Sequence, residues 1–198
     1  MSNFLNDLFH NFKLGFFHVY SLGALDHILF VVVLCVPFLL RDWKRVLVLV
    51  STFTLGHFIS LLLGVYNVVN GSFELIEFLI PLTILVVAGF NIFSAGREDK
   101  NKKLGIVFFS TLFFGVIHGL AYYNELKVDF IDDDNKFLKA FEISIGVEVA
   151  QLLFAGITLI FAWVFQTFCR LNKRDWVIVV SSIVVGVIIP MLIENYPY

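Results

Sequence analysis

Side chains that can bind ions or protons recur inside apolar stretches of this chain. Such groups are costly to bury there, so their presence calls for a chemical explanation. The set comprises His18, Asp26, His27, His57, His118, Glu148 and Gln151. Imidazole and carboxylate groups without thiols suit borderline divalent ions such as Ni²⁺, Co²⁺ or Zn²⁺, and the residue types do not choose among these metals. The same groups also occur in structural hydrogen-bond networks and in proton relays. Spacing alone leaves these interpretations open.

The local spacing of these residues supports a shared interior position. Asp26 directly precedes His27, so it is a candidate ligand or a carboxylate that fixes the tautomer of a histidine. Glu148 and Gln151 are three residues apart and share one face of a helix, and Thr54 and His57 have the same spacing.

The composition determines the kind of element that must hold these groups. Of the 198 residues, 59% are hydrophobic and only 15% are charged, against about 45–50% apolar and about 25% charged in soluble domains. The mean hydropathy is +0.89. The net charge of −2 gives no indication of nucleic-acid binding, and the two cysteines have no paired spacing. We therefore predict an all-α, polytopic bundle of membrane helices whose main partner is the lipid bilayer.

Six stretches approach the roughly 20 apolar residues that a helix needs to cross a bilayer. They are 17–40, 46–69, 75–95, 104–123, 138–168 and 176–193. The chain is thus expected to form one integral membrane domain over residues 1–198. Residues 1–13 are either an amphipathic helix on the outer leaflet or a frayed start of the first span. A homo-oligomer is compatible with this organisation.

The loops predict how the helices are oriented. Basic residues gather in three alternate loops: Arg41, Lys44 and Arg45; Arg97, Lys100, Lys102 and Lys103; and Arg170, Lys173 and Arg174. The positive-inside rule places these loops in the cytoplasm, so both termini and the acidic connection 127–136 face outward. The N-terminus has neither a basic leader nor a small-residue cleavage site, so we expect no removable signal peptide. The predicted location is a bacterial inner membrane, crossed several times.

Helix rise gives the depth of the polar groups. Asp26, His27, His57 and Glu148 lie about 9–11 residues from an end of their spans, which corresponds to roughly 14–17 Å and hence to the middle of the bilayer. His118 lies closer to the outer face, and His18 lies at the outer boundary. Because ionisable groups are expensive against lipid, we expect this set to converge inside the bundle.

These residues also carry a family resemblance. The matching segments are His18 with Asp26-His27-Ile-Leu-Phe, Thr52-Phe-Thr-Leu-Gly-His57, Ile76-Glu77-Phe-Leu-Ile-Pro81, Phe114-Gly-Val-Ile-His118-Gly and Gly146-Val-Glu148-Val-Ala-Gln151. In these motifs the chain resembles the HupE/UreJ family of small bacterial membrane proteins, in its short branch without a signal peptide. The resemblance implies a permease for Ni²⁺ or Co²⁺, with His18, Asp26, His27, His57, His118 and Glu148 along the metal path.

The first functional hypothesis is therefore a secondary permease for divalent transition-metal ions. The chain has no GxxxxGK[ST] loop for ATP, so the ion gradient, the membrane potential or protons would supply the energy. An intramembrane Zn²⁺ hydrolase, with Glu148 as general base, is the second hypothesis. A membrane subunit that transports nothing, and whose polar groups only hold the bundle together, is the third. On the first hypothesis the chain is not an enzyme and the metal ion is its cargo.

Overall fold

The computed structural model of the chain is helical throughout its regular structure. It describes residues 2–21, 25–69, 72–96, 104–130 and 135–197, and no strand occurs in these ranges. The α-helices are α1 (Ser2–Tyr20), α2 (Leu25–Cys35), α3 (Trp43–Val65), α4 (Phe73–Ser94), α5 (Leu104–Leu126), α6 (Lys136–Phe168) and α7 (Lys173–Glu194). Two short 3-10 turns, Leu40–Asp42 and Lys127–Phe130, precede α3 and follow α5.

The predicted all-α membrane bundle is confirmed. Five of the described helices, α3 to α7, are long and apolar enough to cross a membrane, and α1 and α2 together make a sixth span if the pair is counted as one. The five helices coincide within a few residues with the predicted spans 46–69, 75–95, 104–123, 138–168 and 176–193. At 33 residues, α6 measures about 50 Å and exceeds the hydrocarbon thickness.

The first predicted span is the exception, because residues 17–40 do not form one helix. The first helix, α1, ends at Tyr20, and α2 begins at Leu25 and ends at Cys35. The axes of the two helices differ by 74°. With 11 residues, α2 is about 16 Å long and reaches only halfway through a bilayer. A broken helix of this kind is tolerated at membrane depth where protein surrounds it.

Several predictions about the loops and termini stay predictions. The basic residues Arg97, Lys100, Lys102 and Lys103 and the acidic Asp132, Asp133 and Asp134 lie outside the described residues. Residues 2–13 belong to α1, where residues 5–10 are exposed, and the position of this segment on the outer leaflet stays a prediction. The outward position of both termini is predicted from the loop charges alone.

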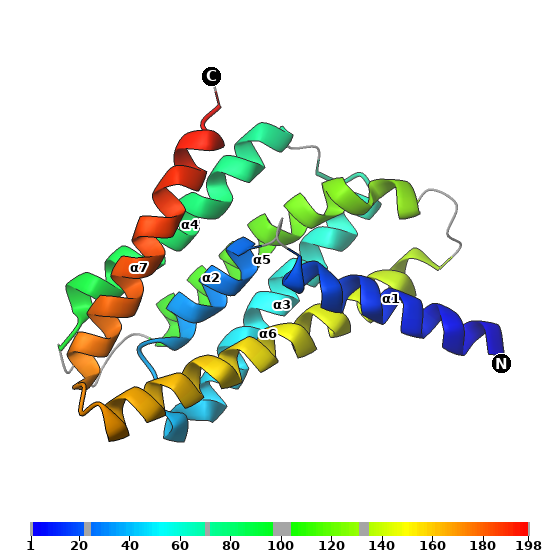
Figure 1. Cartoon of the computed structure of the whole chain (residues 1–198). Coiled ribbons are helices and arrows are strands. Elements are labelled where there is room, and N and C mark those ends of the chain that lie inside the picture. Colours follow the sequence, from blue (N-terminus) through cyan, green and yellow to red (C-terminus); the bar gives the residue numbers. More distant parts are fainter. Residues whose placement is uncertain (1, 22–24, 70–71, 97–103, 131–134, 198) are drawn as a thin grey trace.

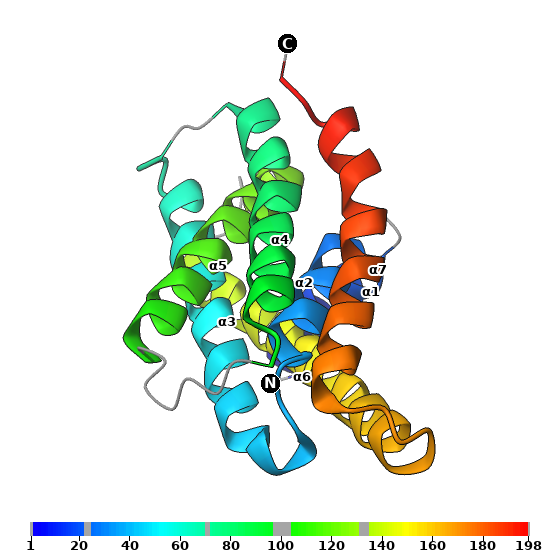
Figure 2. The same ribbon diagram turned by 90° about the vertical axis from the view of Figure 1, so that its left-hand side faces the viewer.

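The helices pack in three main pairs around the short α2. The most extensive contacts are those of α3 with α5, of α1 with α6 and of α4 with α7. Figure 1 shows α1 running alongside α6, and Figure 2 shows α4 and α7 as neighbouring upright helices. Between the pairs, α2 contacts α6 and α4 and also touches α1, α3 and α7. His27 and Phe30, in the first turns of α2, are thereby buried.

Small residues allow α3 and α5 to approach each other closely. A Cβ atom added to Gly115 would overlap the carbonyl oxygen of Phe53, and one added to Gly56 would overlap that of Leu112. Gly119 lies equally tightly against the backbone of His57. Such contacts let membrane helices pack backbone to backbone. Here they bring the imidazoles of His57 and His118, one from each helix, to the same level of the bundle.

This packing predicts that Gly115→Ala destabilises the protein. The new methyl group would meet backbone atoms that cannot rotate away, so we expect a loss of about 1–3 kcal/mol. The measurement is thermal unfolding of the purified protein in detergent. Gly186→Ala in α7 is the matched control, since no atom outside its own helix lies within 4 Å of that position. Equal melting temperatures for the two variants would contradict the tight α3–α5 contact.

Candidate ion-binding site

His27, in the first turn of α2, is the centre of a cluster of imidazoles. Its ring centroid lies 4.9 Å from that of His18, 5.3 Å from that of His118 and 6.0 Å from that of His57. These side chains come from α1, α5 and α3. His57 and His118 are fully buried and His27 nearly so. The fold thus gathers four histidines that are far apart in the sequence.

Asp26 holds His27 in a defined orientation. One carboxylate oxygen, Oδ1, accepts the backbone N–H of His27 at 2.7 Å and lies 3.0 Å from its Nδ1. Because a carboxylate only accepts, Nδ1 carries the proton in the neutral imidazole, and Nε2 then presents a lone pair. Nε2 is buried and has no hydrogen-bond partner in the described part of the chain. Asp26 is also the acidic residue in the first turn of α2, where the helix dipole favours a negative charge.

His118 is held in the same tautomer by different means. Its Nδ1 lies 2.8 Å from the carbonyl oxygen of Phe114, one turn earlier in α5. A carbonyl accepts, so Nδ1 donates and Nε2 keeps its lone pair. As at His27, this Nε2 is buried, and none of the described residues bonds to it. Both histidines therefore offer the type of nitrogen that binds metal ions.

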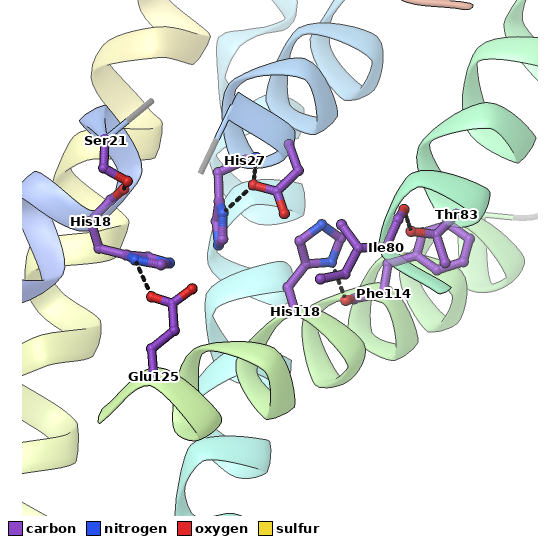
Figure 3. A network of polar contacts seen from close by, with 9 residues as sticks. His18, Ser21, His27, Ile80, Thr83, Phe114, His118 and Glu125 are labelled. Carbon is purple, nitrogen blue, oxygen red and sulfur yellow. Dashed lines mark hydrogen bonds and ion pairs between the residues drawn. The ribbon is translucent and has the colours of Figure 1, made fainter. Parts of the chain in front are cut away.

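His18 completes the cluster from the end of α1. Its ring is stacked on Tyr122 with 3.6 Å between the centroids, and its Nδ1 lies 3.4 Å from Oε2 of Glu125 (Figure 3). The hydroxyl of Tyr122 donates to the carbonyl oxygen of Leu14 at 3.2 Å and so ties α5 to α1. Nε2 of His18 is the third buried imidazole nitrogen with no partner among the described residues.

These groups border a cavity of about 100 Å³ that has room for an ion with several waters. Its lining comprises His18, Asp26, His27, Phe73, Glu77, Ile80, Pro81, His118, Ala121, Tyr122, Glu125, Met191 and Asn195. Figure 3 shows His18, His27, His118 and Glu125 turned towards one another. His57 lies directly behind this lining, with its ring 5.6 Å from Tyr122, and neither of its nitrogens has a partner in the described structure.

Glu148 and Gln151 are not brought to this cavity. Ser51 donates its hydroxyl to Oε1 of Glu148 at 2.6 Å, and Thr54 donates to Oε1 of Gln151 at 3.1 Å. These contacts lie between α3 and α6, and neither α6 residue belongs to the cavity lining. The sequence-predicted site is therefore divided between a histidine-rich cavity and an oxygen-rich contact of two helices.

The sequence as a whole matches a known family. The model of the HupE / UreJ protein family covers residues 2–194, nearly the entire chain. The chain belongs to the HupE/UreJ family. This is a family of membrane proteins associated with nickel and cobalt transport rather than with catalysis. No curated protein and no solved structure matches the chain.

In this HupE/UreJ protein the cavity includes carboxylates that were not among the predicted site residues. Glu125 is seven residues after His118, and Tyr122 is four after it, so the three share one face of α5. That spacing was the available signal for Glu125. Glu77, half-buried in the second turn of α4, also borders the cavity.

The side chains surround the cavity without forming a finished metal site. Over the described residues, no group of three or more His, Cys, Asp or Glu side chains is arranged to hold a metal ion. The nitrogen and oxygen donors surround the cavity but lie too far apart in this arrangement for three of them to share one ion.

The Tyr122 hydroxyl gives a test of how α1 is fastened to this site. Tyr122→Phe keeps the ring stacked on His18 and removes the hydrogen bond to Leu14, so we expect a loss of about 1 kcal/mol in stability. Thermal unfolding in detergent measures it. Tyr66→Phe, at an exposed position after α3, should leave the melting temperature unchanged. An unchanged melting temperature for Tyr122→Phe would show that this hydrogen bond contributes nothing to the position of α1.

Proposed function

We propose that this HupE/UreJ protein is a secondary permease for divalent transition-metal ions, with Ni²⁺ or Co²⁺ as the cargo. One observation carries the proposal: three imidazole Nε2 atoms, from His18, His27 and His118, are buried around one cavity and bonded to none of the described residues. Imidazole nitrogen is a preferred donor for these borderline ions. The family association with nickel and cobalt transport agrees with this chemistry.

Charge balance favours a cation in this cavity. Asp26, Glu77 and Glu125 border it, and each contributes one negative charge when ionised. A divalent cation offsets two of these charges and neutral imidazoles add none, which lowers the cost of holding the ion in a low-dielectric interior. The same balance allows release, since protonation of an imidazole or carboxylate removes a ligand.

The position of the cavity indicates the direction of access. Phe73 and Glu77 lie at the start of α4, Glu125 at the end of α5, and Asn195 directly after α7. In the orientation that the loop charges predict, all these helix ends face the outer side of the membrane. Ions would thus reach the cavity from outside, and the energy for uptake would come from an ion gradient or the membrane potential.

Metal binding by the purified protein tests the proposal directly. Wild type is compared with the double variant His27→Ala, His118→Ala by calorimetric titration of Ni²⁺, Co²⁺ and Zn²⁺ and by uptake into proteoliposomes. We expect reversible binding and uptake in the wild type and loss of both in the double variant. His10→Ala, which alters an exposed histidine of α1, is the matched control and should behave like wild type.

Two outcomes would overturn the permease proposal. The first is unchanged uptake in a well-folded double variant. The second is a stoichiometric Zn²⁺ that survives purification and does not exchange, which would point to a resident catalytic metal instead of a cargo.

Asp26→Asn tests the role of the carboxylate beside His27. Asparagine keeps the shape but can present an N–H to Nδ1, which would favour the tautomer that lacks a lone pair on Nε2. We expect metal affinity to fall about 10–100-fold, as is usual when the carboxylate partner of a ligating histidine is lost. Calorimetry at constant pH measures the change. An affinity within error of wild type would show that Asp26 neither binds the ion nor orients His27 for binding.

A further inference from the structure

The contact between α3 and α6 forms a second polar site, separate from the cavity. Its two cross-helix hydrogen bonds, Ser51 to Glu148 and Thr54 to Gln151, are one helical turn apart on both helices. Thr54 also donates to the carbonyl oxygen of Val50 at 3.2 Å. All the groups gathered here offer oxygen atoms, in contrast to the imidazoles of the cavity. We refer to Ser51, Thr54, Glu148 and Gln151 as the α3–α6 site.

One buried acceptor of this site has unused bonding capacity. Oε2 of Glu148 is buried and without a hydrogen-bond partner within the described structure, although Oε1 accepts from Ser51. Gln151 is fully buried, and its oxygen Oε1 is the atom that could face a cation, since its Nε2 is a donor. A carboxylate oxygen buried in this way would gain from a bound cation.

The Glu148 carboxylate also lacks a compensating charge from the protein. Among the described residues, no Lys, Arg or His nitrogen forms an ion pair with it; the pairs there join His18 to Glu125 and His27 to Asp26. The surface around it is apolar, with Leu55, Ile145 and Val149 exposed. Both helices are long and apolar enough to cross a membrane. An uncompensated charge in such a position costs about 2.5–3.5 kcal/mol.

We propose that the α3–α6 site binds one monovalent cation, Na⁺ or H⁺, at Glu148. A single carboxylate among neutral oxygens is neutralised by one positive charge, whereas a divalent ion would leave a net charge inside the membrane. The oxygen donors suit a hard cation and differ from the nitrogen-rich set that suits Ni²⁺ or Co²⁺.

The other helices packed on this part of α6 bring few positively charged side chains that could neutralise Glu148 in place of a bound cation. From α2, Val31 and Cys35 pack with Ala155 and Leu159, and from α1, Val19 packs with Ile143 and Val147. Glu142, the other carboxylate in this helix, accepts the side-chain amide of Asn11 at 2.8 Å. Along α3, the nearest titratable side chains are Arg45, six residues before Ser51, and His57, six residues after Ser51 and three after Thr54.

His57 lies on α3 three residues beyond Thr54 of the α3–α6 site. Ser51, Thr54 and His57 follow one another at intervals of three residues and so line one face of α3. At the far end of this row, the ring of His57 lies 6.0 Å from that of His27. A change in the charge of the α3–α6 site can thereby reach the cavity through one side chain. On the proposed permease function, the monovalent cation is the ion whose gradient drives metal uptake.

Cation binding is tested with the purified full-length protein and the variant Glu148→Gln, which keeps an acceptor for Ser51. Saturable binding of ²²Na⁺ that the variant lacks would identify Na⁺. Absence of Na⁺ binding, together with an infrared band of a protonated carboxyl group that the variant removes, would identify H⁺. Glu74→Gln, at an exposed position of α4, is the matched control and should change neither signal. If wild type and Glu148→Gln agree in both measurements, the proposal is wrong.

A Ni²⁺ titration and an uptake assay separate this inference from the permease proposal. We expect Glu148→Gln to bind Ni²⁺ as wild type does, since Glu148 lies outside the cavity lining, and to take it up without dependence on a Na⁺ or H⁺ gradient. A loss of Ni²⁺ affinity as large as that of the His27, His118 double variant would place Glu148 in the metal site and overturn the inference. If wild type itself binds and takes up no metal, the permease proposal fails, and the binding experiment with ²²Na⁺ still decides the α3–α6 site.

Discussion

The arrangement of this protein depends on the contact between Asp26 and His27 at the beginning of α2. A carboxylate and an imidazole can be buried in an apolar bundle at low free-energy cost only when each has a partner and protein surrounds both. The break between Tyr20 and Leu25 puts the N-terminal end of a helix next to Asp26, and the helix dipole there favours its charge. The remaining helices pack around Asp26 and His27. These two residues therefore lie where α2 begins and where the other helices meet it.

Close backbone contacts explain how the other histidines reach the centre. The α3–α5 crossing lacks Cβ atoms at Gly56, Gly115 and Gly119, which lets His57 and His118 approach His27. On the other side, Gly15 of α1 and Gly146 of α6 lie against each other's helix backbone. The second contact holds α1 so that His18 at its end faces the cavity. In both pairs, glycines let the two helix backbones approach closely, and this close approach sets the positions of the histidines.

Hydropathy along the sequence was sufficient to predict the bundle and five of its spans, because long apolar segments dictate transmembrane helices. It could not reveal the break before α2, since an apolar run has the same hydropathy whether or not the chain changes direction. Depth along the helices grouped Asp26, His27, His57 and Glu148, with His118 nearer the outer face, but depth carries no information on which side of a helix a group faces. Glu148 has a similar depth and belongs to another contact. Glu125 lies beyond the predicted end of its span at residue 123, and the side-chain contacts that join the end of α5 to His18 and Leu14 of α1 are not visible in the sequence.

The pairing of α1 with α6 has a consequence for biosynthesis. Asn11 and Glu142, which bond to each other across this pair, are separated by 131 residues. During synthesis α1 must therefore wait for most of the chain to be made before its partner exists. Until then the short α2, which is too short to span the bilayer alone, lacks the α6 surface that encloses it. The cavity is accordingly assembled late, and a ribosome-bound chain that stops before α6 contains the histidines but not the site.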